Sequence, residues 1–475
     1  MKYLIFGTGD YYNRYKKWFD KDSVLALLDN SSQKQNTFID GIEVLSPARG
    51  VQLPYDAVII LSFYVKSMKE QLLGLGVPDD KIYHFYDLHK LIKPEARSRP
   101  VRYFGKAFEL IRDGECKNKI LLLSQDLTFG GPSLALFQGA VVLKAHGYDV
   151  VYGSMMDGPL REKIEEACIP VVVDENLQVG TMEDCGWLSG FSLIVCNTIN
   201  FHVFLSKRNT DISAIWWLHD SLFFYDGVDK ALLQEIDQRN LRVVSVGPVP
   251  RQAIQSFLPD LEVGTLNYGV LDAAQDNRRL REKRDKVCLL TIGYIENRKG
   301  QDILIQAIRM LPEEDRKKAE FYLVGQDSSL MAQQLKEETA DWDNIFFTGT
   351  VDREEIHRLL TKGDVLICPS REDPMPTVAA EAMMHGLPCI LSDAAGTAEY
   401  ICDGRDGFVF PCQNVSKLAE KIDWCINHCD CLYSMGAEAR KIYVSRFSSD
   451  VFERELVKLT DACLNPAHNG AERDF

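Results

Sequence analysis

The sequence lacks a long apolar run, an excess of positive charge and any regular spacing of cysteines. No run approaches the roughly 20 apolar residues of a membrane-spanning helix, so we expect no such helix. The formal net charge of −15 disfavours broad electrostatic attraction to nucleic acid or to anionic lipid. An anionic ligand would therefore have to be bound by cations gathered at one place.

The thirteen cysteines are scattered, mostly within apolar segments such as SLIVC (192–196), where a thiol packs as a small apolar side chain. This usage is typical of a reducing compartment and predicts a cytoplasmic protein. One group contains the residue types of a metal site, but it lies in a helix-like segment without a second ligand pair at zinc-site spacing. We expect no metal at these residues, which are Cys425, His428, Cys429 and Cys431.

The 475 residues, 46% of them hydrophobic, are too many for one core, and we expect two or three domains. Strand-like and helix-like segments alternate in three successive series, which favours α/β domains with parallel sheets. We place a Rossmann-like domain at 1–94, a second domain at 118–272, a third at 273–448 and a C-terminal helix and tail at 449–475. The basic segment 95–117 is interpreted as a linker with one short helix.

The most informative segment is PSREDPMPTVAAEAMMHGLP, residues 369–388. Its prolines favour an extended entry into a helix, so that Asp373 precedes the helix and Glu381 lies about one turn inside it. A helix start favours negative charge, which predicts a diphosphate site at Pro376, Thr377 and Val378. Spacing alone leaves two alternatives open, namely that Asp373 caps the helix and that Glu381 is a surface residue.

Three further segments place polar or glycine residues after strands. In residues 291–308 a strand ends at Gly293, and Arg298 and Lys299 follow before a helix, where two cations suit phosphate groups. In residues 122–140 two glycines allow a close backbone approach to a ligand. These glycines are Gly130 and Gly131. After the strand-like segment AIWWL comes His219, although a histidine in such a place more often packs than reacts.

Together these segments resemble the large retaining family of GT-B glycosyltransferases with a Glu-x7-Glu motif, known as glycosyltransferase family 4 or group 1. The resemblance covers roughly residues 118–460. Its best-matching parts are the loop from Gly293 to Lys299 and Gly300, the strand EFYLVG, and the segments FFTGTVDREEIHRLLTKGDVLICPS, EAMMHGLPCILSD and AAGTAEYICDGRDGFVF.

The resemblance implies a GT-B fold, in which two Rossmann-like domains face a cleft, and a reaction without metal or cofactor. By motif position, Asp373 would contact the transferred sugar, Glu381 the ribose and His219 the sugar or the acceptor. Lys299, Arg298, Gly130 and Gly131 would serve the phosphates. Two positions depart from the family pattern: Asp373 stands where the first motif glutamate usually lies, and Tyr294 stands where an arginine often follows the loop glycine.

The expected function is retaining transfer of a hexose from a nucleoside-diphosphate sugar, with UDP-sugar as the expected donor. The acceptor would be a glycan or a lipid-linked molecule in bacterial-type surface polysaccharide synthesis. The reaction would take place in the cytoplasm, with at most peripheral membrane contact through the basic helix near residues 101–114. The alternative is a catalytically weak GT-B subunit that binds a partner glycosyltransferase or a glycan, as Tyr294, Asp373 and the extra domain suggest.

The N-terminal domain contains an incomplete dinucleotide fingerprint, FGTGDYY. Gly7 and Gly9 are present, but Tyr12 stands where the third glycine would allow close helix packing. Asp29 lies about where a ribose-binding carboxylate would. The sequence leaves open whether this domain binds a nucleotide or serves as a packing module that docks a partner or a second copy of the chain.

Overall fold

The structure is a computed structural model, and it describes residues 1–93, 99–112, 118–274 and 285–465. By its internal contacts the chain forms two compact units. The first unit comprises Met1–Ala140, Gly147–Ile215 and Leu222–Leu241. The second comprises Val141–His146, Trp216–Ser221 and Arg242–Phe475.

The first sheet has six strands in the order β3-β4-β2-β1-β5-β6. Their bounds are β1 Tyr3–Phe6, β2 Val24–Leu28, β3 Phe38–Ile39, β4 Ile42–Leu45, β5 Ala57–Ile60 and β6 Ile82–His84. β1 pairs in parallel with both β2 and β5, and its apolar side chains are buried. From β1 the chain first crosses to β2 and β4 on one side of it, and then to β5 and β6 on the other side. The helices are α1 Asp10–Tyr15, α2 Pro47–Gly50, α3 Val65–Gly74 and α4 Leu88–Leu91.

The second sheet has eight strands in the order β14-β13-β12-β11-β8-β9-β10-β7. Their bounds are β7 Arg102–Phe104, β8 Lys119–Ser124, β9 Asp149–Ser154, β10 Val171–Val173, β11 Leu193–Asn197, β12 Ser213–Leu218, β13 Leu241–Ser245 and β14 Gly264–Thr265. The main helices between them are α5 Ala107–Arg112, α6 Gly131–Ala145, α7 Leu160–Glu166, α8 His202–Ser206, α9 Lys230–Glu235 and α10 Pro248–Gln255.

The basic segment 95–117 is more than the linker with one helix that its composition indicates. Besides α5 it contains β7, which pairs antiparallel with β10 and forms an edge of the second sheet. Arg102 and Tyr103 of this strand face Val173 and Val172 in register. Residues 95–98 and 113–117 lie outside the described residues.

The N-terminal domain packs against the second sheet's domain within the first unit. The indole N–H of Trp18 donates to Gln178, with 2.8 Å between nitrogen and oxygen. The hydroxyl of Tyr86 donates to the side chain of Asn200 at 3.1 Å. Lys90 forms an ion pair with Asp229 at 3.1 Å. The two domains therefore share a polar and aromatic interface.

The third sheet has six parallel strands in the order β17-β16-β15-β18-β19-β20. Their bounds are β15 Val287–Ile292, β16 Ala319–Val324, β17 Ile345–Gly349, β18 Val365–Cys368, β19 Cys389–Ser392 and β20 Gly407–Phe410. The principal helices are α11 Gln301–Met310, α12 Glu313–Arg316, α13 Leu330–Glu338, α14 Arg353–Lys362, α15 Thr377–Met384, α16 Val415–Asn427, α17 Leu432–Ile442 and α18 Ser449–Leu464.

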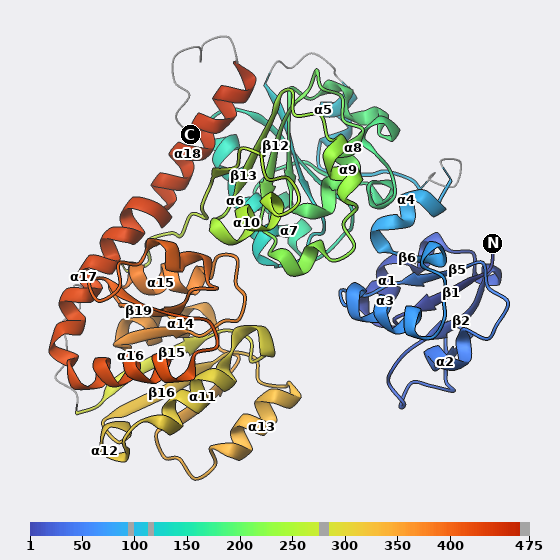
Figure 1. The fold of residues 1–475 in the computed structure, drawn as a ribbon. Coiled ribbons are helices and arrows are strands. Elements are labelled where there is room, and N and C mark those ends of the chain that lie inside the picture. The colour runs from blue at the N-terminus through green and yellow to red at the C-terminus, as the bar shows by residue number, and fades with distance from the viewer. Residues whose placement is uncertain (94–98, 113–117, 275–284, 466–475) are drawn as a thin grey trace. The chain divides into compact units, whose positions relative to one another are not determined.

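Helices cover both faces of the third sheet, which is why its strands read as nearly continuous apolar runs. Figure 1 shows α14 and α15 on one side of this sheet, and α11 and α16 on the other. The core between sheet and helices includes Leu289, Ile305 and Phe321, each at most 1% exposed. Within the described parts of the chain, no helix combines the length and apolar character needed to cross a membrane.

Candidate functional site

The strongest candidate site lies at the carboxyl ends of β15 and β18. These neighbouring strands mark the point where the crossovers of the third sheet reverse direction, which is where open α/β sheets bind ligands. The loop after β15 and the loop after β18 touch closely, because a Cβ atom at Gly300 would overlap the carbonyl oxygen of Pro369. Gly300 has a φ of +71°, so glycine suits both the conformation and the contact.

Lys299 and Asp373 form an ion pair between these two loops. Their Nζ and Oδ2 atoms lie 2.6 Å apart, and the side chains are 22% and 7% exposed. The stem of Lys299 passes about 3.9 Å from the position that a Cβ atom at Gly293 would occupy. A Cβ atom there would make only an ordinary van der Waals contact with the lysine, so it is the φ of +151° at Gly293 that favours glycine.

The backbone of Asp373 is fixed on both sides by the loop after β19. Its N–H donates to the carbonyl of Ala394 at 3.1 Å, and its carbonyl accepts from the N–H of Gly396 at 2.9 Å. The alternative that Asp373 caps the following helix is wrong, because the N-cap residue of α15 is Pro376 and no side chain caps it. Asp373 is a buried, fixed carboxylate with a cation beside it.

Glu381 is buried on α15, so the alternative that it is a surface residue is also wrong. It is 4% exposed, and its Oε1 atom lies 2.7 Å from Nη2 of Arg353. Arg353 begins α14, and most of its side chain is exposed. Sequence reasoning missed this arginine, because nothing in the spacing links two residues that are 28 positions apart.

Arg298 takes a different place from Lys299. Its guanidinium pairs with Glu296, with 3.1 Å between Nη2 and Oε1, and also donates to the carbonyl oxygen of Glu372 at 3.3 Å. The side chain is 39% exposed. Of the two cations expected to bind phosphate, only Lys299 contacts Asp373, whereas Arg298 lies on the same loop with an acidic partner of its own.

The start of α15 offers backbone donors beside this pair. Pro376 is its N-cap, and the first helical residues are Thr377 and Val378. Among the residues that the structure describes, the N–H groups of Thr377 and Val378 have no hydrogen-bond partner. Together with Lys299, these N–H groups form a local positive region in an acidic chain, as an anionic ligand requires.

His219 lies in the second unit and forms a buried pair with Tyr268. Nδ1 of His219 and the hydroxyl oxygen of Tyr268 are 3.0 Å apart, and the two rings stack with centroids 5.5 Å apart. Burial lowers the pKa of His219 to about 3, so the ring is neutral near pH 7. Its Nε2 atom is buried and has no hydrogen-bond partner in the described structure. This nitrogen is free to meet a ligand hydroxyl.

Tyr268 is also influenced by the charge of Asp373. Burial raises the pKa of Tyr268, and the charges of Asp373 and Asp220 raise it further. Sequence reasoning did not select this tyrosine as a site residue, because it lies in a short segment without a recognisable motif.

Gly130 and Gly131 belong to the first unit, where Gly130 ends the loop after β8 and Gly131 begins α6. Neither has a positive φ, and a Cβ atom at Gly131 would meet nothing within 4 Å. At Gly130 the nearest atom would be Oγ1 of Thr128 at 3.4 Å. The fold does not require glycine at either position, which leaves the backbone open to a ligand.

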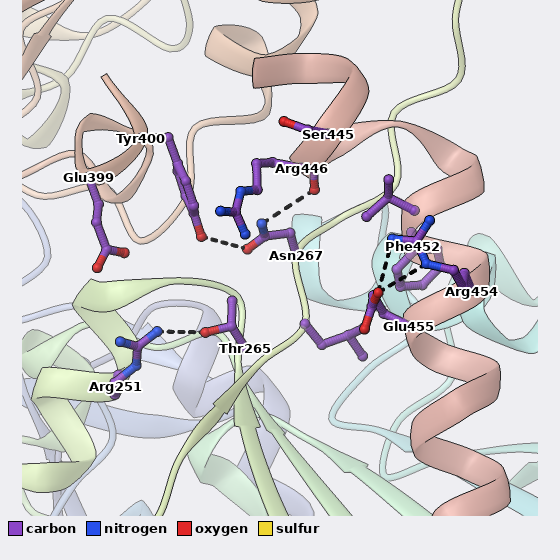
Figure 2. Close-up of a pocket in the computed structure, with 12 residues that line it drawn as sticks. Arg251, Thr265, Asn267, Glu399, Tyr400, Ser445, Arg446, Phe452, Arg454 and Glu455 are labelled. Carbon is purple, nitrogen blue, oxygen red and sulfur yellow. Dashed lines mark hydrogen bonds and ion pairs between the residues drawn. The ribbon is translucent and has the colours of Figure 1, made fainter. Parts of the chain in front are cut away.

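A separate cavity of about 520 Å³ lies in the second unit, and no predicted site residue lines it. Figure 2 shows Tyr400 joined to Asn267 by a hydrogen bond of 3.2 Å, with Arg446 nearby. The guanidinium carbon of Arg446 lies 5.7 Å from the centroid of the Tyr400 ring. Asn267, which lines this cavity, directly precedes Tyr268 of the buried histidine–tyrosine pair in the sequence.

In the described ranges, no three histidine, cysteine or acidic side chains are grouped to hold a metal ion. Cys425 is buried within α16, where it belongs to the core of the third sheet's domain. His428 instead stacks on Trp424, with ring centroids 4.5 Å apart. Packing explains these two members of the cysteine and histidine group.

The site coincides with a region that matches a known family. Residues 272–442 match the family model described as Glycosyl transferases group 1, and residues 1–83 match the model described as C2185-like, N-terminal. This part of the chain is thus a domain similar to the group 1 glycosyl transferases. Lys299, Asp373, Glu381 and Arg353 all lie within that domain.

Curated relatives agree with this assignment. The chain is 26% identical to spore coat protein SA of Bacillus subtilis over 344 residues, which cover 67% of this chain and 91% of the relative. It is 33% identical over 128 residues to the lipopolysaccharide glucosyltransferase WaaG of Escherichia coli, which cover 27% of this chain and 33% of the relative.

Solved structures show the same fold. Anabaena Alr3699/HepE in complex with UDP and glucose has a TM-score of 0.58 and 21% identity, covering 72% of this chain and 99% of that chain. WaaG, described as a glycosyltransferase of lipopolysaccharide biosynthesis, has a TM-score of 0.52 and 15% identity, covering 74% of this chain and all of that chain. These likenesses establish the GT-B fold, to which this chain adds an N-terminal α/β domain.

Proposed function

We propose that this GT-B glycosyltransferase moves a hexose from a UDP-sugar to a glycan or lipid-linked acceptor, with retention of anomeric configuration and without metal or cofactor. The observation that carries the proposal is the enclosed Lys299–Asp373 pair at the meeting point of β15 and β18. The match of residues 272–442 to group 1 glycosyl transferases supports it. The complex of Alr3699/HepE with UDP and glucose supports the choice of donor.

In the proposed complex the donor diphosphate takes the place of Asp373 as the partner of Lys299. The ammonium group and the free N–H groups at the start of α15 then stabilise the negative charge that grows as UDP leaves. Asp373, released from the lysine, accepts hydrogen bonds from hydroxyls of the transferred sugar. Glu381, oriented by Arg353, accepts hydrogen bonds from the ribose hydroxyls.

The transferred sugar passes through an oxocarbenium-like state. The acceptor oxygen forms its bond to the anomeric carbon on the face from which the phosphate oxygen leaves, and that phosphate oxygen takes the acceptor proton. No protein base is then required. The neutral, buried ring of His219 fits this scheme, because its free Nε2 atom can contact a sugar hydroxyl without bringing a positive charge near the oxocarbenium.

The proposed setting is the synthesis of a surface polysaccharide, in the cytoplasm or at the inner face of the membrane. A relative in lipopolysaccharide synthesis and another named as a spore coat protein support this setting. The N-terminal domain is the part of the chain through which a partner glycosyltransferase or a second copy of the chain would bind. Which hexose is transferred is decided by the experiment below.

The test is release of nucleoside diphosphate from a panel of nucleotide sugars with EDTA present. We expect UDP release with one UDP-sugar for the wild type, and a loss on the order of 10²–10³-fold for Lys299→Ala, because one charge that stabilises the leaving group is removed. The matched control is Lys336→Ala, which breaks a lysine–aspartate pair of the same domain in which Nζ lies 2.5 Å from Asp327. The control should keep full activity.

Each other outcome has a definite meaning. No release from any donor by the wild type would favour the alternative, a catalytically weak subunit that acts through a partner. Full release by Lys299→Ala would reject this site. Loss of activity in EDTA that returns with a divalent cation would reject metal independence, and a product of inverted anomeric configuration would reject retention.

A further inference from the structure

The N-terminal sheet has a pocket of its own at the point where its crossovers reverse direction. The pocket lies at the carboxyl ends of β1, β2 and β5 and has a volume of about 320 Å³. This is within the range of about 300–1,000 Å³ that is usual for small-molecule sites. It is lined by three loop segments, 6–11, 29–30 and 61–64, together with Met68.

The two glycines of the first loop have different explanations. Gly7 has a φ of +111°, and a Cβ atom there would overlap the carbonyl oxygen of Leu61, so the fold itself requires glycine. Gly9 has a φ of −93°, and a Cβ atom there would meet nothing within 4 Å. No contact within the described residues requires glycine at position 9. Because Gly9 has no side chain, the space beside it in the pocket stays open.

Aromatic rings form one wall of the pocket. Phe63 and Tyr64 are 40% and 65% exposed, although large aromatic side chains are costly to leave in water. Phe63 packs against Tyr11, with ring centroids 4.4 Å apart, and against Phe224 at 5.5 Å. Tyr64 lies 6.2 Å from Phe223. An aromatic surface thus runs from this pocket onto the short helix η10 (Leu222–Tyr225) of the second sheet's domain.

The polar groups of the pocket are acceptors and hydroxyls rather than cations. Asp10, Asp29, Asn30, Ser62 and Thr8 line it, and no lysine or arginine does. Lys34, which does not line the pocket, pairs with Asp29 at 3.3 Å and donates to Thr8. The balance of charge at the pocket is therefore negative, which opposes a diphosphate.

Carboxylates and amides that accept hydrogen bonds from hydroxyls, beside exposed aromatic rings that cover the apolar face of a pyranose, match one chemical class. We propose that this pocket binds a neutral glycan and not a nucleotide. The glycan lies against Tyr64 and Phe63, donates hydroxyls to Asp29 and Asp10, and continues over Phe223. That this glycan is the acceptor rests on the proposed function, whereas the binding itself does not.

The experiment uses the full chain with UDP present in excess, so that the donor site is occupied. Binding is first measured on an array of neutral oligosaccharides, and the best ligand is then titrated by calorimetry. We expect Gly9→Leu, which fills the pocket, and Tyr64→Ala, which removes its exposed ring, to raise the Kd at least about tenfold, equal to 1.4 kcal/mol. In separate titrations without excess UDP, binding of UDP, ADP and NAD⁺ to the same variants is measured.

Two matched controls keep the result specific. Gly74→Leu makes the same change at another glycine of this domain with open space around its Cβ position. Phe38→Ala removes a ring that is 69% exposed but does not line the pocket. Both should leave the Kd unchanged.

Three outcomes would overturn the proposal: no neutral oligosaccharide binds, the best ligand binds Gly9→Leu as well as wild type, or Gly9→Leu abolishes binding of a nucleotide. None of these depends on the donor site. UDP release by the wild type and its loss in Lys299→Ala are measured separately, so failure of the glycan pocket and failure of the proposed function are distinguishable.

Discussion

The first and third sheets each place a lysine–aspartate pair in the loops at the carboxyl ends of their strands, yet the two pairs differ. Lys299 and Asp373 come from loops after different strands, lie 2.6 Å apart and are 22% and 7% exposed. Lys34 and Asp29 come from one loop, lie 3.3 Å apart and are 45% and 14% exposed. The topology of a parallel sheet determines where a ligand binds. The burial of the charged side chains at that place, and their net charge, determine which class of ligand binds there.

The change with the largest expected effect is Asp373→Asn. It keeps the shape of the side chain but removes the carboxylate that would contact the transferred sugar. We expect turnover to fall on the order of 10²–10³-fold. UDP should bind at least as tightly as before, because Lys299 no longer has a competing carboxylate. Turnover is measured as the rate of UDP release, and the affinity for UDP is measured by titration.

The corresponding change at the first sheet, Asp29→Asn, is the control. It removes a carboxylate of the N-terminal pocket, and we expect UDP release from the donor sugar to be unchanged when no acceptor glycan is present. Equal losses of turnover in the two variants would mean that both pockets act on the donor. Weaker UDP binding to Asp373→Asn would contradict the idea that the carboxylate and the diphosphate compete for Lys299.

The sequence predicts the parts of the site that depend on local structure. Asp373 and Glu381 lie around a single helix start, and proline and glycine punctuation marks that helix, so their spacing could be interpreted without knowing the tertiary fold. Lys299 follows a strand in a loop of defined length. The alternation of strands and helices likewise gives the three sheets, because a parallel sheet imposes a regular order on the chain.

Other features depend on contacts between distant residues, and no local pattern encodes them. Arg353 meets Glu381 only because α14 and α15 lie on the same side of the third sheet. Tyr268 is defined by its contact with His219, 49 positions earlier. The three-residue strand β7 is too short and too polar for its pattern to stand out in a basic segment.

Each unit contains a buried histidine that is expected to make the stability of the fold depend on pH. Burial lowers the pKa of His219 to about 3 and that of His202 to about 4. Both rings stay neutral in the folded chain while the unfolded chain takes up protons below about pH 6.5. Stability is therefore full above pH 6.5 and is lost as the pH falls toward 4. At pH 5 we expect each ring to cost about 2 kcal/mol.

Urea unfolding at pH 7 and pH 5 measures this effect. His219→Gln and His202→Gln each remove a buried ring, which lowers stability at both pH values, so the quantity compared is the difference in stability between the two pH values. We expect each variant to lose less stability than the wild type on acidification. A variant with the full wild-type difference would show that its histidine is protonated in the folded chain.

The smallest expected effect belongs to the exposed pair of the first sheet. Burial raises the pKa of Asp29, but hydrogen bonds from Thr8, Ser31 and Lys34 outweigh it and leave that pKa below its ordinary value. Lys34→Met removes only the last of these donors. Because the lysine is half exposed, we expect a loss of less than about 1 kcal/mol in urea unfolding at pH 7.

Turnover of Lys34→Met should equal that of the wild type, in contrast to Lys299→Ala. Neutral glycan should bind Lys34→Met with an unchanged Kd, since Asp29 keeps its hydrogen bonds from Thr8 and Ser31. A large loss of UDP or NAD⁺ binding in this variant would show that Lys34 serves a phosphate. Both sheets would then bind a phosphate-containing ligand and would differ only in the position of the lysine. The greater exposure of Lys34 would not have prevented it from binding a phosphate.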